Sequence, residues 1–371
     1  MHVKKSIIGA AMFAAAALTL AACGEAPPEE PTSTSDDSTG SSEDEASSDV
    51  YACLVSDQGG FEDQSFNQAG YEGLQRAEAE LGVRINAVAS ETDADFAPNI
   101  DTMIQEGCTL IIGAGFLLED AIQTAAEANP DIQFALVDSA FTDPDFNVVE
   151  IDNAKPLLFN TVEAAFLGGY VAAAMSESGI VATYGGQPIP SVQIFMDGYA
   201  AGIEQYNTDN GTEVRLLGWD AQAQQGDFAG SFEDQSAGQN LTQTFLAQGA
   251  DVILPVAGPV GLGTGAALDS NGSGSMIWVD SDGYLTTDFG SIIITSVMKQ
   301  IGPAVFTAIE ESVNGNYTNA PYVGTLEDGG VGLAPYYDFE GTIPQEVVQR
   351  VEELQQEIID GERTVESVNS P

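Results

Sequence analysis

Short apolar runs alternate with amphipathic segments from residue 51 to the C-terminus. The apolar runs are rich in Val, Ile and Leu, which is typical of strands that are buried on both faces. The segments between them repeat apolar residues at helical spacing, as Tyr71, Leu74 and Leu81 do in the first of them. Alternation of strands and helices predicts parallel sheets that are built from β-α-β units.

The pattern occurs in two successive sets, and this predicts two doubly wound α/β lobes. Each predicted strand is short and each predicted helix is longer. The expected strands are 51–56, 83–89, 109–114, 132–138, 148–152, 180–186, 213–220, 251–257, 275–280 and 329–336, and joins between the lobes are expected near 153–156 and 294–299. The expected helices are 65–82, 95–107, 117–130, 156–179, 196–207, 236–249, 302–315 and 342–361, with a further glycine-rich helix start after 257. We expect residues 51–153 and 298–320 in the N-terminal lobe, and 154–297 and 321–371 in the C-terminal lobe.

The first residues are typical of a secretory signal. Lys4 and Lys5 precede an apolar run, and a polar stretch follows that run at once. The segment from Leu20 to Gly24 resembles the bacterial lipobox, in which the cysteine is lipidated and begins the mature chain. We therefore expect a signal peptide over 1–22 and a lipid anchor on Cys23 that holds the protein outside the cytoplasm, at the cell membrane. An ordinary signal peptide with a chance cysteine is the alternative.

Residues 23–50 are rich in Pro, Ser, Thr, Asp and Glu, so they cannot bury enough apolar surface to fold. We expect a disordered acidic tether there. The whole chain has 57 acidic and 9 basic residues and a formal net charge of −48, which excludes nucleic acid as a partner. Such a charge suggests a saline habitat, in which salt screens the repulsion.

The sequence also restricts the chemistry that is available. Its single histidine is His2, inside the predicted signal, so catalysis by a Ser-His-Asp or Cys-His arrangement is excluded. A metal site would have carboxylate ligands alone, and we expect no metal and no cofactor. The glycines of Gly261-x-Gly263-x-x-Ala266 fit a dinucleotide fingerprint by spacing, but they begin well after the apolar run of the preceding strand. We expect no enzymatic activity.

The stretch from 56 to 74, SDQGGFEDQSFNQAGYEGL, places a carboxylate, a glycine turn and a ring at the end of the first strand. Ligands of doubly wound sheets bind beyond the carboxyl ends of the strands. Ser65 and Gln68 have the spacing of a capping box, so Phe66 would begin a helix at that edge. Phe66 could then stack on a flat ligand, and Asp57 could accept hydrogen bonds from it. A structural turn with Phe66 as a hydrophobic staple is the alternative.

This stretch resembles the signature of the basic membrane protein family of lipoproteins, which are substrate-binding components of ABC importers and include a purine nucleoside receptor. Six further motifs recur in the family's order: FALVDS, GADVILPVAG, GLGTGAAL, VDSDGY, ITSVMKQIGPAVFTAI and GGVGLAPY. The resemblance implies a type I periplasmic-binding-protein-like fold with a multi-strand hinge, in which two lobes close on a nucleoside. It also implies a monomer that works with permease subunits and an ATPase.

The resemblance assigns ligand contacts residue by residue. Asp57 matches an aspartate at the end of the first strand, Phe66 the ring that stacks on the base, and Asn67 its neighbour in the motif. Asp138 matches an aspartate that faces the base. Asp280 matches a carboxylate that binds the ribose hydroxyls, and Asp282 is the alternative counterpart. Lys299 matches a lysine at the hinge that reaches the sugar. Gly258, in the loop after strand 251–257, is a further expected contact.

One position departs from the family pattern. Where the family closes a second ring over the base, this chain has Leu254, which puts the base preference in doubt. Phe116 could supply a ring from another strand end. A sugar or other small metabolite as the ligand, or a surface adhesion lipoprotein without a transport role, are the alternative functions.

Several of these residues also have structural interpretations. Asp138 and Asp280 could be helix N-caps, and Lys299 could form a structural ion pair with a carboxylate such as Asp280, because an unpaired charge is costly to bury. Cys53 and Cys108 lie in the first and third predicted strands, which are commonly neighbours. They could form a disulfide, or they could be two buried thiols.

Overall fold

Six strands form a first sheet in the computed structural model, and all neighbouring strands in it are parallel. The structure describes residues 49–143, 145 and 147–371. The predicted signal peptide, Cys23 and residues 23–48 of the predicted tether lie outside the described residues. In spatial order the strands are β13 (Tyr322–Gly324), β5 (Ala154–Phe159), β4 (Gln133–Val137), β3 (Leu110–Ala114), β1 (Tyr51–Ser56) and β2 (Arg84–Ala89).

A second sheet has the same winding and one antiparallel edge, where β14 pairs with β12. Its strands in spatial order are β14 (Val331–Leu333), β12 (Ile293–Lys299), β11 (Ser275–Asp280), β10 (Val252–Val256), β6 (Ile180–Gly185) and β7 (Arg215–Leu217). A small hairpin of β8 (Trp219–Asp220) and β9 (Gln225–Gly226) follows β7.

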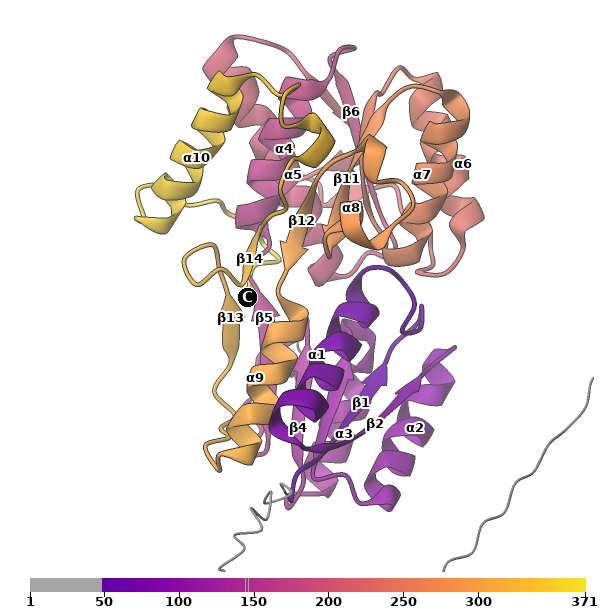
Figure 1. Ribbon diagram of the computed structural model, residues 1–371, viewed down its shortest axis with the longest axis vertical. Helices are drawn as coiled ribbons and strands as arrows, with labels where there is room; N and C mark the ends of the chain where they lie inside the picture. The colour runs from indigo at the N-terminus through magenta and orange to yellow at the C-terminus, as the bar shows by residue number, and fades with distance from the viewer. Residues whose placement is uncertain (1–48, 144, 146) are drawn as a thin grey trace, which may run out of the picture. The chain divides into compact units, whose positions relative to one another are not determined.

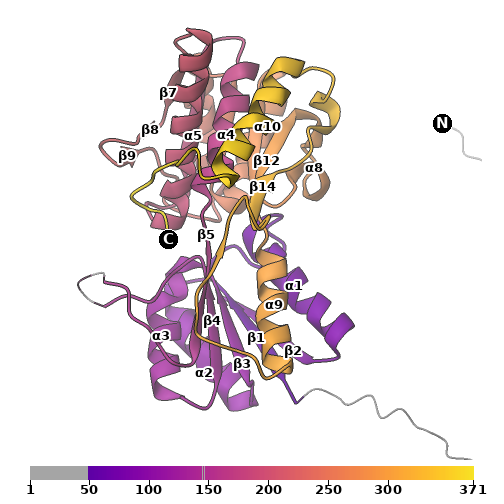
Figure 2. The same cartoon turned by 90° about the vertical axis from the view of Figure 1, so that its left-hand side faces the viewer.

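Helices cover both faces of each sheet, so each sheet with its helices forms one lobe (Figures 1 and 2). In the first lobe α1 and α9 cover one face, and α2 and α3 cover the other. In the second lobe α4, α5 and α10 lie on the face opposite α6 and α7, and the short α8 follows β11. The bounds are α1 (Phe66–Leu81), α2 (Asp93–Glu106), α3 (Glu119–Ala128), α9 (Ile301–Val313), α4 (Val162–Met175), α5 (Pro190–Asn210), α6 (Gln235–Ala247), α7 (Gly261–Asn271), α8 (Gly283–Thr286) and α10 (Gln345–Ile359). The predicted two-lobed, doubly wound α/β fold is confirmed.

Within the described residues the chain passes between the lobes three times: after β5, after β12, and between β13 and β14. The expected lobe boundaries do not match the sets of strands that form the two sheets. The expected boundary after residue 153 falls before β5, and the one after 320 falls before β13, although both strands belong to the first sheet. The expected strand 148–152 is absent among the described residues, where Val148 makes an isolated bridge to Thr142. Ile151 packs into the core instead.

The error at residue 156 has a simple cause. Pro156 followed by an apolar run fits the first turn of a helix, and we expected a helix from there. In the structure Pro156 lies inside β5, and α4 begins later, at Val162. The run Leu157–Phe159 lies between β4 and β13, a position in the sheet interior that requires continuous apolar residues.

Close helix packing positions the start of α1. A Cβ on Gly73 of α1 would lie 2.3 Å from the carbonyl oxygen of Gly302 on α9, so these two helices meet backbone to backbone. No larger side chain fits there without moving a helix. The contact therefore holds α1 close against α9, the helix that directly follows β12 and the second crossing between the lobes.

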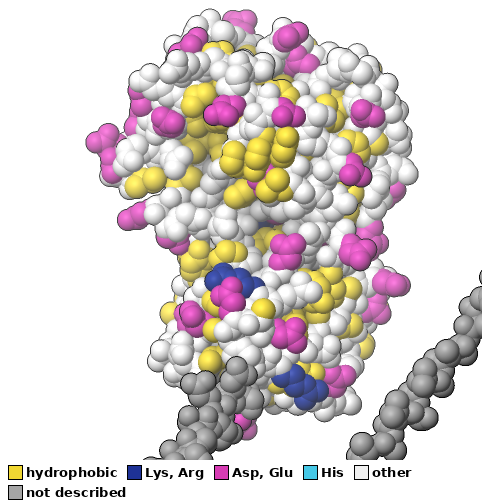
Figure 3. Space-filling model, viewed as in Figure 1, with side chains coloured by type: hydrophobic (Ala, Val, Ile, Leu, Met, Phe, Trp, Pro, Cys, Tyr) yellow, Lys and Arg dark blue, Asp and Glu magenta, His cyan; other side chains and the backbone are white. Residues whose placement is uncertain are grey.

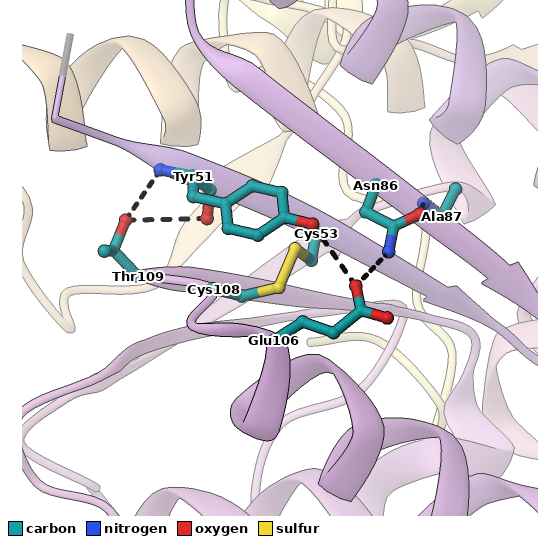
Figure 4. The surroundings of a disulfide bond; sticks show 7 residues. All are labelled: Tyr51, Cys53, Asn86, Ala87, Glu106, Cys108 and Thr109. Carbon is teal, nitrogen blue, oxygen red and sulfur yellow. Dashed lines mark hydrogen bonds between the residues drawn. A yellow bond between two sulfur atoms is a disulfide. The ribbon is translucent and has the colours of Figure 1, made fainter.

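A disulfide joins Cys53 of β1 to Cys108, just before β3, with a Cα–Cα distance of 6.1 Å (Figure 4). The bridge spans neighbouring parallel strands, because β1 lies between β2 and β3. Of the two alternatives that the sequence left open, the structure has the bridge. The side chain of Glu106 lies beside it and accepts hydrogen bonds from Tyr51 and Asn86.

Candidate functional site

A cavity of about 500 Å³, including its open mouth, lies between the carboxyl ends of the two sheets. The residues that line it come from both lobes. They are Asp57, Gln58, Asp63, Phe66, Asn67, Gly115, Phe116 and Asp138 from the first lobe, with Ile189, Ser191, Val192, Phe195, Phe232, Val256, Ala257, Gly258, Pro259, Asp280 and Lys299.

Asp57 directly follows β1 and points its carboxylate into this edge of the first sheet. Its N–H donates to the carbonyl of Ala114 at 3.0 Å, and its Oδ1 accepts a hydrogen bond from Asn67 Nδ2 at 3.2 Å. Gly115 makes room for it, because a Cβ at Gly115 would lie 1.9 Å from Asp57 Oδ2. Burial raises the pKa of Asp57 well above its usual value of 3.8, although the Asn67 hydrogen bond lowers it. Asp57 is therefore a buried, cavity-lining acid that holds its proton more tightly than an exposed aspartate.

Asn67 brings an unused acceptor to the cavity wall. Its side chain is buried, and its Nδ2 donates to Asp57 Oδ1 and to the carbonyl of Gln58 at 3.0 Å. These two bonds fix the orientation of the amide. Among the described residues, no donor reaches its Oδ1. A buried acceptor without a partner costs free energy, and a ligand N–H would relieve that cost.

Asp63 caps α1, which corrects the expected capping box of Ser65 and Gln68. The Asp63 carboxylate accepts hydrogen bonds from the backbone N–H groups of Ser65, Asn67 and Gln68 at 2.8–3.0 Å. Ser65 occupies the N-cap position, but its side chain makes no cap hydrogen bond. Burial raises the pKa of Asp63 to about 6 even though the three N–H groups lower it. Phe66 is the first residue of α1, as the sequence predicted.

Lys299 is the last residue of β12. It lies between Asp138, which directly follows β4 of the first sheet, and Asp280, which is the last residue of β11 of the second sheet. It forms ion pairs with Asp138 and with Asp280, the latter at 3.3 Å from Nζ to Oδ1. All three side chains are buried. Burial lowers the pKa of Lys299, but the charges of Asp138 and Asp280 outweigh it and raise the pKa. Lys299 therefore forms ion pairs with two carboxylates, and it also lines the cavity.

Asp138 and Asp280 have matching backbone geometry. Both adopt a left-handed conformation, with φ of 67° and 68°, at the ends of β4 and β11. Neither is a helix N-cap. The N-cap of α8 is Asp282, which accepts a hydrogen bond from the N–H of Tyr284 and one from the Tyr337 hydroxyl. Asp282 is not among the described residues that line the cavity.

Four phenylalanines of the described part of the chain line the cavity. Lys299 Nζ lies 4.8 Å from the ring centre of Phe66 and 5.2 Å from that of Phe195, so these two rings flank one cation. Phe116 lines the first-lobe wall, where we expected it as an additional ring, and Phe232 lines the second-lobe wall. Leu254 is fully buried within β10 and is not part of the described cavity lining.

Sequence reasoning missed Asp63, Phe195 and Phe232. Phe195 lies on α5, which begins at Pro190, and we expected this helix to start at 196. A proline at the first helical position was the available signal. Gly258 lies in the turn after β10 and lines the cavity. Gly263 packs against the carbonyl of Gln235, so helix packing accounts for this glycine and no dinucleotide is needed to explain it.

The family model Bmp, described as ABC transporter substrate-binding protein PnrA-like, matches residues 51–368. The chain belongs to this family. It is therefore an ABC transporter substrate-binding protein of the Bmp family, and the resemblance to basic membrane proteins is confirmed.

Two relatives and one solved structure cover most of this Bmp-family chain. It is 28% identical to the ABC transporter nucleoside-binding protein BmpA of Lactococcus lactis, over 86% of this chain and 90% of the relative. It is 30% identical to an uncharacterized lipoprotein of Pyrococcus abyssi, over 84% and 78%. A crystal structure of an ABC transporter solute-binding protein from Aeropyrum pernix aligns with a TM-score of 0.75 and 27% identity, over 84% of this chain and 92% of that one.

Two features are absent from the described residues of this Bmp-family chain. No helix there is both long and apolar enough to cross a bilayer. In the same part of the chain, His, Cys, Asp and Glu do not gather into a group that could hold a metal ion.

Proposed function

We propose that the cavity binds a nucleoside, with a purine nucleoside as the first candidate. The observation that carries the proposal is the unpartnered, buried Oδ1 of Asn67 beside Asp57, in a cavity that Phe66 and Phe195 also line. Aromatic rings suit a planar base, and adjacent oxygen acceptors suit its N–H donors. In this proposal Asp138 faces the base, Asp280 accepts hydrogen bonds from the ribose hydroxyls, and Lys299 donates to the sugar.

The charge of the cavity supports an uncharged ligand. Of the described residues that line it, four are aspartates and one is a lysine, which is already paired with two of them. A phosphate group would meet several buried carboxylates and no unpaired cation among these residues. A nucleoside therefore fits this lining better than a nucleotide does.

We also infer that the protein is a lipid-anchored, extracytoplasmic component of an ABC importer. The cleavage pattern that ends at Cys23 supports a signal peptide over 1–22 and lipidation of Cys23. The name of the Lactococcus lactis relative supports nucleoside binding, and that of the Pyrococcus abyssi relative supports a lipoprotein. Its partners would be permease subunits and an ATPase, and it would act as a monomer without catalysing a reaction on its ligand.

A thermal-shift screen of nucleosides, free bases and sugars tests the ligand. A ligand that binds the folded state alone stabilises it by about 2.7 kcal/mol at one hundred times its Kd. Unfolding of about 320 residues has an entropy of roughly 0.7 kcal/mol/K, so we expect a rise in Tm of about 4 °C with inosine, guanosine or adenosine. A rise with ribose or another sugar alone would favour the sugar alternative, and no rise with any compound would favour the adhesion alternative.

Two matched variants locate the site. Phe66→Leu removes a cavity-lining ring and should abolish most of the nucleoside-induced rise in Tm. Phe61→Leu makes the same substitution in the same loop, at a ring that stacks on Tyr71 with a centroid distance of 4.7 Å and is not among the described lining residues. It should keep the rise. An equal loss in both variants would contradict the proposed site.

A further inference from the structure

A loop of the first lobe contacts the second lobe at the edge of the cavity. The hydroxyl of Ser65 is buried and lies 3.0 Å from two acceptors in the second lobe, the carbonyl of Val279 and Asp280 Oδ2. Its single hydrogen is shared between them. One of these acceptors belongs to a carboxylate in the cavity wall, so Ser65 orients a group that faces the ligand.

The preceding residue makes a second contact across the lobes. The carbonyl of Gln64 accepts hydrogen bonds from Ser281 Oγ at 2.8 Å and from Thr286 Oγ1 at 3.1 Å. Gln64 has a left-handed φ of 58°, a conformation that a non-glycine residue rarely adopts. Four hydrogen-bond contacts in total join residues 64 and 65 to the segment 279–286.

The first two residues of α1, directly after this loop, line the cavity. Phe66 and Asn67 follow Ser65 without a break, and the Asp63 carboxylate fixes the backbone of Ser65 and Asn67 together. A ligand that orders residues 66 and 67 therefore also aligns Ser65 with its acceptors in the second lobe. Conversely, separation of the lobes would take Asp280 and Val279 away from the Ser65 hydroxyl.

We propose that Ser65 is a positioning residue that couples occupancy of the cavity to closure of the two lobes, by holding Asp280 in its ligand-facing orientation. The coupling rests on the proposed function, because it requires the ligand to occupy this cavity. The Ser65 contacts exist only while the lobes are together, so their loss acts on the closed, ligand-bound state. Ser65→Ala should therefore speed ligand release and leave the association rate nearly unchanged.

The chain contains its own control for this substitution. The pentapeptide Phe-Glu-Asp-Gln-Ser occurs twice, at 61–65 and at 232–236. In both copies the aspartate caps the following helix, Asp63 that of α1 and Asp234 that of α6. The serine of the second copy, Ser236, is exposed and lies inside α6, and its backbone N–H donates to Asp234. Ser236→Ala is thus the same change in the same local sequence without the contact between lobes.

Binding kinetics of inosine, guanosine and adenosine to the wild type, Ser65→Ala and Ser236→Ala give the first measurement. Because Ser65→Ala loses a hydrogen bond to a charged, buried acceptor, we expect its Kd to be about 10- to 100-fold higher, as a result of faster dissociation. Ser236→Ala should stay within about twofold of the wild type. An unchanged Kd in Ser65→Ala, or a loss carried by the association rate, would overturn the coupling.

A second measurement does not depend on the ligand. Hydrogen exchange of the empty protein should be faster over residues 279–287 in Ser65→Ala than in the wild type, because the variant loses the contacts with Val279 and Asp280 and keeps only those of the Gln64 carbonyl. The double variant Ser281→Ala/Thr286→Ala removes the donors to Gln64 from the other side and should act in the same direction. If exchange over this segment is unchanged in both variants, the coupling is wrong. If the exchange responds but no nucleoside binds the wild type, the nucleoside assignment fails instead.

Discussion

Replacing Lys299 with Met would remove the cation that Asp138 and Asp280 share. The Asp138 and Asp280 side chains are each 8% exposed, and that of Lys299 is 2% exposed. Met keeps an apolar stem of similar length, so the change removes charge more than volume. Removing one partner of a buried ion pair costs about 3–5 kcal/mol, because the remaining charges are left uncompensated. We expect a loss of that size in the free energy of unfolding near pH 7, together with weakened ligand binding.

Two companion variants test the reasoning. Lys155→Met makes the same substitution at a lysine whose partner, Glu311, has a side chain that is 31% exposed and can regain water. It should cost less than Lys299→Met. The triple variant Lys299→Met/Asp138→Asn/Asp280→Asn leaves no charge behind and should recover most of the lost stability.

Urea unfolding at constant high salt measures all four proteins, with the salt chosen to screen the general negative charge. The deficit of Lys299→Met should shrink as the pH falls, because protonation of the two unpaired aspartates removes the buried charge. A deficit below about 1 kcal/mol at pH 7, or a triple variant no more stable than the single one, would refute the view that Lys299 compensates buried carboxylates.

Two further predictions concern the first lobe. Because the folded pKa of Asp63 is raised to about 6, its contribution to stability is fully present below pH 3.8 and is lost as the pH rises through 6. The free energy of unfolding of the wild type relative to Asp63→Asn should therefore fall by about 3 kcal/mol between pH 3.5 and 7, and a constant difference in urea unfolding would contradict the shift. The Cys53–Cys108 bridge closes a sequence separation of 55 residues. Cys53→Ala/Cys108→Ala should lose about 4 kcal/mol on the chain-entropy model, and a loss below about 1 kcal/mol by the same measurement would argue against that origin.

Local patterns predicted the parts of the fold that depend on neighbours in sequence. The apolar run before Asp57 and the helical spacing after Ser65 placed Phe66 at the first residue of α1. The same reasoning failed where the local sequence is compatible with two different structures. Pro156 suits both a helix start and an inner strand, and its position between β4 and β13 selected the strand. Ser65 and Gln68 have capping-box spacing, but Asp63 reaches the same N–H groups and leaves the Ser65 hydroxyl for the second lobe.

The far wall of the cavity depends on tertiary structure. The first-lobe residues Asp57, Phe66 and Asn67 are close in sequence, and one motif identified them together. Phe195 and Phe232 face the same space from α5 and from the loop before α6, and no local spacing connects them to Phe66. Leu254 was selected by its place in a motif, but it lies inside β10 and is fully buried in the core, whereas Val256, two residues later on the same face, lines the cavity.

The three passages of the chain between the lobes have a consequence for biosynthesis. The first sheet takes its edge strand β13 from residues 322–324, and α9 covers that sheet from residues 301–313, near the end of the 371-residue chain. A polypeptide that ends before residue 301 therefore contains five strands of this sheet, with α1 but not α9 on one face. The first sheet therefore acquires its full set of native neighbours only when residues 301–324 are present.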